Sequence, residues 1–229
     1  MSGAGTRPSR PAQARAPDRT LADTDLEDLV GKIRACRVCR EMPRGTPLPH
    51  EPRPVVVASR MARILIAGQA PGLRVHETGI PFNDRSGDRL RDWLGVSRET
   101  FYDPANFAIA PMGFCFPGYD AKGGDLPPRR ECAPTWRSML MAAMPQIEMV
   151  LTIGQYAQAW HLRDPQKVSL TETVANWRTV FQASCKPRHL PLPHPSWRNN
   201  GWLRRHPWFE GELLPALRRE IAIRIQQDS

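Results

Sequence analysis

Short apolar runs alternate along the chain with segments in which apolar residues recur every three or four positions. The continuous runs predict four strands, at Ile64–Ala67, Phe107–Ala110, Met149–Ile153 and Leu190–Leu192. Segments with helical spacing separate these strands, and such alternation is typical of a parallel sheet that is covered on both faces. We therefore expect an α/β fold: a three-layer sandwich with a central, mostly parallel, four-stranded sheet flanked by helices.

The connecting helices are predicted from their apolar stripes. Thr24 and Glu27 have the spacing of a capping box, and an apolar stripe follows over residues 26–33. A second helix is expected to start near residues 84–86. Others are expected over residues 129–144, over residues 155–162, and at a C-terminal stripe of Leu214, Leu217, Ile221 and Ile225. Ligands of such folds bind at the carboxyl ends of the strands, where the unusual loops after residues 67 and 192 both fall.

The N-terminal segment differs in composition from the rest. Residues 1–22 are rich in proline and arginine and hold almost no large apolar side chain, so they cannot bury enough surface to offset the entropy of ordering. We expect a disordered basic tail over residues 1–22 and a single folded domain over residues 23–229. No apolar run is long enough to span a bilayer, and none resembles a signal peptide. We therefore expect a monomer in the bacterial cytoplasm or nucleoid, with no membrane partner.

The charge adds a candidate partner. The 229 residues include 32 basic and 23 acidic ones, for a formal net charge of +9, and only four of the basic residues are lysines. Arginine presents a planar fork that suits phosphate, so the bias indicates a nucleic acid, although a GC-rich genome would favour the same residue. The excess is concentrated, because residues 186–205 contain five basic residues and no acidic one.

The cysteines suggest a metal centre. Cys36 and Cys39 form a CxxC pair, and Cys115 and Cys132 lie 17 positions apart around a loop rich in glycine and proline. Four thiolates suit either tetrahedral zinc or an iron–sulfur cluster, and the spacing does not choose between them. Buried free thiols are the alternative. Cys185 is left over, and we interpret it as an ordinary thiol.

The first chemical motif is a tight turn directly after the first predicted strand. It consists of Gly68, Gln69, Ala70, Pro71 and Gly72. Two glycines and a proline set a turn that exposes backbone N–H groups to a ligand. The pattern differs from a phosphate-binding P-loop.

The segment 79–88 is richer in candidate chemistry. Phe82 could stack on a flat ring, Asn83 could contact polar edges, and Asp84 places a carboxylate at a predicted helix start. A helix N-cap role for Asp84 and a core position for Phe82 are the alternatives.

A third motif follows the last predicted strand. His194 stands between Pro193 and Pro195, and this constrains its backbone as a positioned functional group requires. Nearby, Trp197 could wedge into a base stack while Arg198 contacts phosphate. A proline-rich surface loop is the alternative.

In their order along the chain, these motifs resemble those of the uracil-DNA glycosylase superfamily, and most closely its iron–sulfur (family 4-type) enzymes. The likeness covers about residues 26–218 and includes the turn 68–72, the Gly-x-Pro-Phe segment 79–82, the His194–Pro195 motif and the cysteine order. Members flip a nucleotide out of DNA and cleave its glycosidic bond. The resemblance implies a monofunctional DNA repair glycosylase, without lyase activity, for uracil or a related deaminated base. It also implies a structural 4Fe–4S cluster, with zinc as the less favoured occupant, on Cys36, Cys39, Cys115 and Cys132.

The resemblance also implies roles for single residues. The turn 68–72 would line the substrate pocket, with Phe82 stacked on the base and Asn83 nearby. His194 would donate to the base oxygen on which negative charge develops. Asp84 would aim a water molecule or stabilise the sugar cation. DNA contacts are expected from Ser196, Trp197, Arg198, Arg204 and Arg205.

Two positions depart from the family pattern. Ala70 stands where the most efficient members carry a carboxylate, so this position cannot act as a base. Pro111 stands where members usually carry an asparagine that contacts the polar edge of uracil, and a site without that amide should discriminate poorly between pyrimidines. Two further hypotheses stay open: a non-catalytic binder of damaged or single-stranded DNA on the same fold, and a zinc-stabilised protein of unrelated function.

Overall fold

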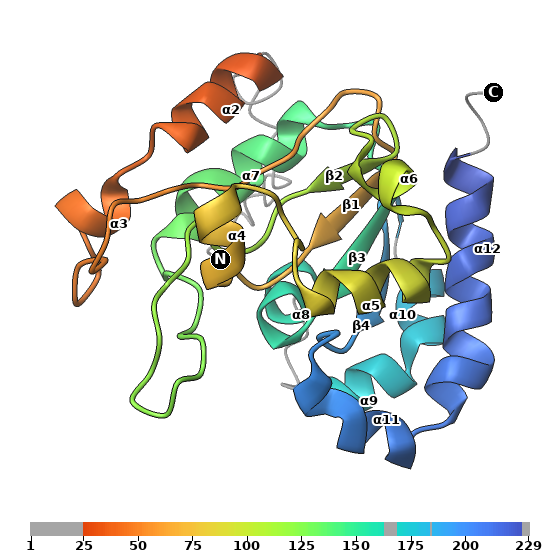
Figure 1. The fold of residues 1–229 in the computed structure, drawn as a ribbon. Helices are drawn as coiled ribbons and strands as arrows, with labels where there is room; N and C mark the ends of the chain where they lie inside the picture. Colours follow the sequence, from red (N-terminus) through yellow and green to blue (C-terminus); the bar gives the residue numbers. More distant parts are fainter. Residues whose placement is uncertain (1–24, 163–168, 184, 226–229) are drawn as a thin grey trace, which may run out of the picture.

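The predicted sheet is present, and all of its strands are parallel. The computed structural model describes residues 25–162, 169–183 and 185–225, so the predicted tail over residues 1–22 lies outside the described residues. The sheet has the order β2-β1-β3-β4 (Figure 1). Its strands are β1 (Ile64–Ala67), β2 (Phe107–Ile109), β3 (Met149–Ile153) and β4 (Arg188–Leu192).

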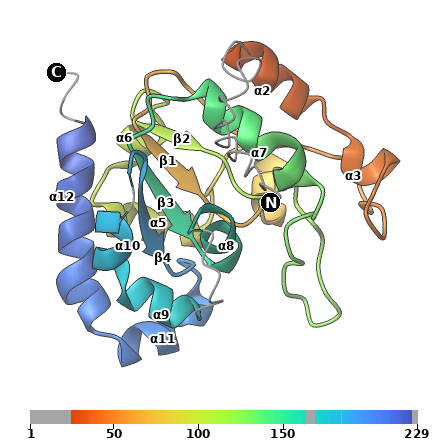
Figure 2. The same cartoon turned by 180° about the vertical axis from the view of Figure 1, so that it is seen from behind.

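Helices cover both faces of this sheet, as Figure 1 and the reverse view in Figure 2 show. One face packs against α5 (Arg85–Leu94), α6 (Arg98–Tyr102), α9 (Leu170–Ala175), α10 (Trp177–Ala183) and α12 (Leu214–Ile225). The other face packs against α2 (Leu26–Arg34), α7 (Cys132–Ala143) and α8 (Gln155–Leu162). Three short helices lie in the connections: α3 (Val38–Glu41), α4 (Leu73–Thr78) and α11 (Asn200–Arg205). The expected three-layer α/β sandwich is therefore confirmed. Within the part of the chain described, no helix is long and apolar enough to cross a membrane.

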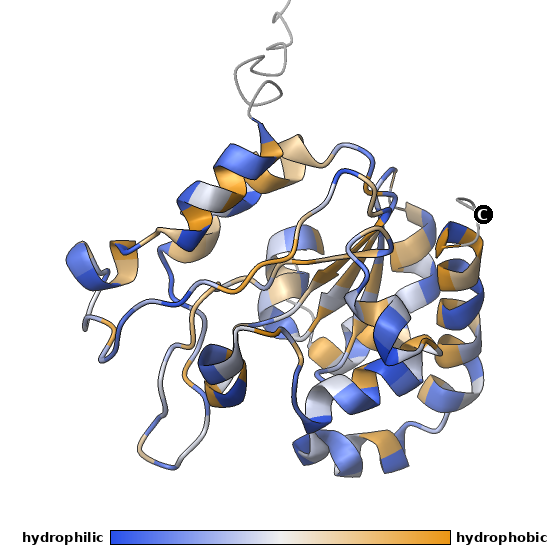
Figure 3. Ribbon diagram, turned by 45° about the horizontal axis from the view of Figure 1, so that its top comes forward, coloured by the Kyte–Doolittle hydropathy of each residue, from blue (hydrophilic) through white to orange (hydrophobic). Residues whose placement is uncertain are grey.

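The strands are apolar along their whole length because both faces of the sheet are buried. In β1, Ile64 and Ile66 belong to the core on the α5 side, whereas Leu65 and Ala67 belong to the core on the α7 side. Figure 3 shows the same contrast: the strands are predominantly hydrophobic, and the helices carry hydrophilic residues outward. This double burial explains why continuous apolar runs predicted the strands so closely.

The differences from the predicted elements are local. β4 begins at Arg188 rather than Leu190. Its backbone pairing with β3 already starts at Arg188, two residues before the apolar part of the strand. Thr24 lies outside the described residues, and Asp25 is the N-cap of α2: its Oδ1 accepts a hydrogen bond from the Glu27 N–H at 3.2 Å. The predicted helix over residues 129–144 starts instead at Cys132.

The carboxyl ends of the parallel strands meet at one edge of the sheet. The strand order changes direction between β1 and β3, and ligands of doubly wound folds bind at such a switch point. The segments that follow β1, β2 and β4 converge there, and each contributes residues to the same pocket. The loops after residues 67 and 192, which the sequence analysis singled out, therefore lie together at one pocket.

Candidate active site and cysteine cluster

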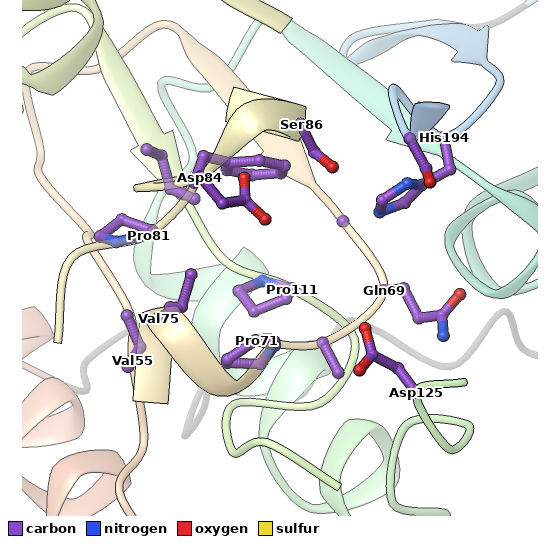
Figure 4. Close-up of a pocket in the computed structure, with 16 residues that line it drawn as sticks. Val55, Gln69, Pro71, Val75, Pro81, Asp84, Ser86, Pro111, Asp125 and His194 are labelled. Carbon is purple, nitrogen blue, oxygen red and sulfur yellow. The ribbon is translucent and has the colours of Figure 1, made fainter. Parts of the chain in front are cut away.

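A pocket of about 120 Å³ lies at this edge (Figure 4). Its apolar end is buried and is formed by Val55, Val75, Pro81, Ile109 and Pro111. Its polar side chains are more exposed and are those of Gln69, Asp84, Ser86, Asp125, His194 and Ser196. The pocket thus has an apolar floor and a polar mouth, and its volume suits one small planar ring better than a drug-sized ligand.

The predicted turn after β1 forms one wall of the pocket, and all five of its residues line it. The turn is fixed by two backbone hydrogen bonds from the segment after β2. The Met112 N–H donates to the Gly68 carbonyl, and the Gly113 N–H donates to the Gln69 carbonyl, each at 2.9 Å. Gly72 ends the turn as the N-cap of α4.

Phe82 lines the pocket and is held by its backbone as well as its ring. It has a positive φ of 52°, which a phenylalanine rarely adopts. The Tyr102 hydroxyl donates to its carbonyl at 3.2 Å. A Cβ added at Gly87 would lie 1.7 Å from that carbonyl oxygen, so only glycine fits there, and a Cβ at Gly68 would lie 3.2 Å from the ring. These contacts fix the Phe82 ring beside the turn.

Asp84 is both a helix N-cap and a pocket residue, so the two predicted positions for its carboxylate do not exclude each other. It is the N-cap of α5, with Oδ1 accepting a hydrogen bond from the Gly87 N–H at 2.9 Å, and its side chain also lines the pocket. Asn83, by contrast, is not among the residues that line the pocket. Its Oδ1 accepts a hydrogen bond from Arg98 Nη2 at 3.2 Å, so the structure does not bring it to the predicted base-binding position.

His194 faces Asp84 across the mouth of the pocket (Figure 4). Its own carbonyl accepts a hydrogen bond from Asn199 Nδ2 at 2.7 Å, and this anchors the loop after β4. Burial lowers the pKa of the His194 imidazole, while the Asp84 carboxylate partly opposes that shift. A pKa below 6.5 leaves the ring neutral at pH 7, with one N–H available as a donor.

Asp125, which was not predicted from the sequence, lines the pocket from the loop between the third and fourth cysteines. The signal that could have found it is local: Asp125 directly follows Gly123 and Gly124, and a carboxylate after a glycine pair in a long loop is a candidate for function. Asp125 is far from the other motifs along the chain, so the sequence did not indicate that it would lie in the same pocket.

Of the predicted DNA-contacting residues, Ser196 lines the pocket, and Arg198 is close enough for its charge to affect the pKa of Asp125. Ser196 caps a short 3₁₀ turn that contains Trp197 and Arg198. Trp197 is 68% exposed, and the Arg198 guanidinium lies 5.8 Å from its ring centroid. Arg204 and Arg205 are exposed in the last turn of α11. A tryptophan this exposed, among exposed arginines, has no role in packing the core.

The four predicted cysteine ligands lie in one region. Cys39, Cys115 and Cys132 are buried and Cys36 is half-buried, whereas Cys185 is exposed. Burial raises the pKa of Cys39 to about 11 and that of Cys132 to about 12. Burial also raises the pKa of Cys115, and charge on each of the other three thiols would add to that shift. Among the described residues, no three His, Cys, Asp or Glu side chains are grouped as the ligands of a metal ion.

A buried arginine lies beside these cysteines, and its surroundings show whether a negatively charged metal centre would fit there. Arg137 in α7 is 1% exposed; its Nη2 donates to the Ala110 carbonyl at 2.8 Å, and its Nη1 has no hydrogen-bond partner. Burial lowers the pKa of Arg137 to about 10, and charge on Cys132 opposes that shift. A buried charge without a counter-charge is costly. The residues therefore fit a negatively charged, thiolate-bound group next to Cys132.

These features define an α/β protein with a pocket for one flat ring at the switch point of its sheet, and with a carboxylate and a neutral imidazole at the pocket mouth. The chain belongs to the uracil DNA glycosylase superfamily, whose sequence profile matches residues 55–218. Members of this superfamily are DNA glycosylases. The matched residues include the pocket-forming motifs and also two of the cysteines, Cys115 and Cys132. Cys36 and Cys39 precede its first residue, so the iron–sulfur subtype stays a prediction.

The geometry of the mouth predicts how His194 titrates. NMR of the imidazole protons should give a pKa below 6.5, because burial disfavours the imidazolium, and Asp84→Asn should lower it further by removing the opposing carboxylate. Asp92→Asn, an exposed substitution on the same helix, should leave the His194 pKa unchanged. A His194 pKa at or above 6.5, or one that Asp84→Asn does not change, would contradict this arrangement.

Proposed function

We propose that the protein is a DNA glycosylase that hydrolyses the N-glycosidic bond of uracil or a related deaminated base in DNA. The observation that carries the proposal is the convergence of Phe82, Asp84 and His194 on one pocket of a single ring's size. A base inside duplex DNA cannot reach such a pocket, so the target nucleotide must be flipped out of the stack. Flipping costs least for a mispaired base, and this favours deaminated bases over normal ones.

Base recognition depends on Phe82 and on the apolar end of the pocket. The Phe82 ring offers a stacking face, and the turn 68–72 forms a wall near it. Pro111 is buried on the floor and has neither an N–H nor a side-chain amide to contact the base edge. Selectivity among pyrimidines that depends on hydrogen bonds is therefore weaker here than with an asparagine at this position.

The groups at the mouth supply the chemistry. In the transition state the sugar carries positive charge and the departing base carries negative charge. The Asp84 carboxylate stabilises the sugar cation, and the neutral His194 ring donates its N–H to the base oxygen on which charge develops. Asp84 holds its geometry because one of its oxygens is bonded to the N-terminus of α5.

Base release tests this function directly. Asp84→Asn and His194→Ala should each lower the single-turnover rate of base release by about 100-fold or more, because each removes charge stabilisation that is needed only in the transition state. The assay should cover uracil, hypoxanthine, xanthine and oxidised pyrimidines in single- and double-stranded DNA, with Asp92→Asn as control. The product should be an abasic site in an intact strand.

Full activity of both variants would exclude the mechanism. Tight binding of uracil-containing DNA without any base release by the wild-type protein would instead identify a non-catalytic binder.

The exposed basic segment beside the pocket is the proposed DNA-binding edge. Trp197 acts as a wedge in the space that the flipped base leaves, and Arg198, Arg204 and Arg205 contact the backbone phosphates. The exposure of these four side chains, and the continuity of their segment with Ser196, which lines the pocket, support this role.

Salt dependence measures these phosphate contacts. Replacing Arg198, Arg204 and Arg205 by glutamine should weaken DNA binding. It should also reduce the slope of log K against log salt by about 0.9 for each phosphate of duplex DNA that is no longer neutralised. Arg219→Gln, an exposed arginine of α12, serves as the control and should change neither quantity. An unchanged slope in the triple variant would remove this segment from the DNA interface.

The cysteine cluster is proposed to hold a structural 4Fe–4S cluster through Cys36, Cys39, Cys115 and Cys132. Such a cluster cross-links α3, the loop after β2 and the start of α7, and its thiolate charge compensates the buried Arg137. The electrostatic effect of the other three thiols on Cys115 and the unpaired guanidinium of Arg137 support this assignment. A single zinc ion on the same four thiolates is the less favoured occupant, as the resemblance to the iron–sulfur enzymes implies.

Metal analysis distinguishes the two occupants. The purified full-length protein should contain iron and acid-labile sulfide and should absorb at about 400 nm, as iron–sulfur proteins do. Cys132→Ser should lose iron, and Cys185→Ser should retain it because Cys185 is exposed and lies outside the set. A colourless wild-type protein with one zinc ion per chain would overturn the cluster assignment.

A further inference from the structure

Asp125 is held in a defined position by a small hairpin in the long loop after β2 (Figure 1). Asp125 pairs with Tyr119 in an isolated antiparallel bridge, and the Leu126 N–H donates to the Gly118 carbonyl at 2.9 Å. Asp120 closes the tip: its Oδ1 accepts hydrogen bonds from the Lys122 and Gly124 N–H groups, both at 2.8 Å. The hairpin therefore carries Asp125 on an ordered arm, although the loop contains few apolar residues.

The Asp125 side chain is directed at the turn after β1. Its Oδ2 lies 3.8 Å from the position that a Cβ would take at Gly72, and Figure 4 shows it beside Gln69 on the side of the pocket opposite Asp84. Among the hydrogen bonds of the described residues, none is donated to the Asp125 carboxylate. The Asp125 carboxylate is therefore available to bind a ligand or a water molecule in the pocket.

Charged groups on three elements surround this carboxylate. Burial is the main cause that raises the pKa of Asp125, and the negative charges of Asp84 and Asp120 act in the same direction. Arg198, on the loop after β4, opposes them and favours the ionised form. Two carboxylates thus share the pocket, with a cation at its mouth.

The difference in burial between the two ends of the pocket indicates which part of a bound nucleotide Asp125 would contact. With a base bound at the buried apolar end, as the proposed function requires, the sugar would lie at the mouth, among the more exposed polar groups. Asp125 is the most exposed of these and stands next to the turn that contains Ala70. A loop from a distant part of the chain therefore brings a carboxylate to the turn, where Ala70 itself supplies none.

We propose that Asp125 is a second catalytic carboxylate, which binds the attacking water and faces the sugar cation from the side opposite Asp84. This inference depends on the proposed glycosylase function. The water oxygen forms a bond to C1′ while the C1′–N bond breaks and its electron pair leaves with the base. The water gives one proton to the Asp125 carboxylate, which releases it to solvent, and the departing base is stabilised by the His194 N–H and then takes a proton from solvent.

The matched pair Asp125→Asn and Asp120→Asn tests the role. Both remove one negative charge from the same hairpin, and in Asp120→Asn the new amide oxygen can still accept the two backbone hydrogen bonds. Asp125→Asn should lower the single-turnover rate of base release by about 100-fold, with substrate DNA bound at least as tightly as by the wild type. Asp120→Asn should leave the rate within about threefold, because Asp120 lies outside the pocket.

A binding experiment separates charge stabilisation from loop structure. DNA with a cationic pyrrolidine in place of the target sugar imitates the charged transition state, and DNA with a neutral tetrahydrofuran does not. The wild type and Asp120→Asn should prefer the cationic DNA, and Asp125→Asn should lose about tenfold or more of that preference. A mere loss of hairpin structure would weaken both ligands together.

The outcomes are distinct. If wild-type protein releases base and Asp125→Asn matches its rate and its preference for the cationic DNA, Asp125 is not catalytic and the glycosylase proposal stands. If the wild type releases no base from any substrate and shows no preference for the cationic DNA, the proposed function and this role of Asp125 both fail.

Discussion

The active pocket depends on one contact, the approach of the Phe82 carbonyl to the first turn of α5. Glycine at position 87 leaves room for that carbonyl, where a Cβ would lie 1.7 Å away. The same turn is capped by Asp84, so the contact sets the Phe82 ring and the Asp84 carboxylate in one rigid unit. The Tyr102 hydroxyl supports the same segment: its acceptors are the Pro81 carbonyl at 2.9 Å and the Phe82 carbonyl at 3.2 Å. Base stacking and charge stabilisation are therefore positioned by the same few atoms.

The segment after β2 connects the pocket with the cysteine cluster. The Ala110 carbonyl accepts a hydrogen bond from the buried Arg137, Pro111 forms part of the pocket floor, and the Met112 N–H holds the turn after β1. The buried guanidinium beside Cys132 is thus bonded to the residue that directly precedes the pocket floor. Arg137 and this segment therefore link the cysteines to the floor of the pocket.

The sequence predicted the sheet well because its strands are buried on both faces and so form uninterrupted apolar runs. It also located the turn 68–72, Phe82, Asp84 and His194, because each follows or precedes a regular element at short range. The short helices α4 and α6 were missed, since five or six residues form no apolar stripe. Asp125 was missed for a different reason: its role follows from the path of a long loop, and only the folded chain brings that loop to β1.

Because all strands are parallel, the residues that stabilise the fold and the residues proposed to bind and cleave DNA lie in different parts of the molecule. The residues proposed to act in catalysis or to contact DNA lie on segments that follow β1, β2 and β4, while the two apolar cores lie between the sheet and its helices. Loops at this edge are free to change length and composition at little cost to folding. Exchanging the hairpin after β2 would therefore move or remove the proposed catalytic carboxylate of Asp125, with the sheet and its helices kept as a constant frame.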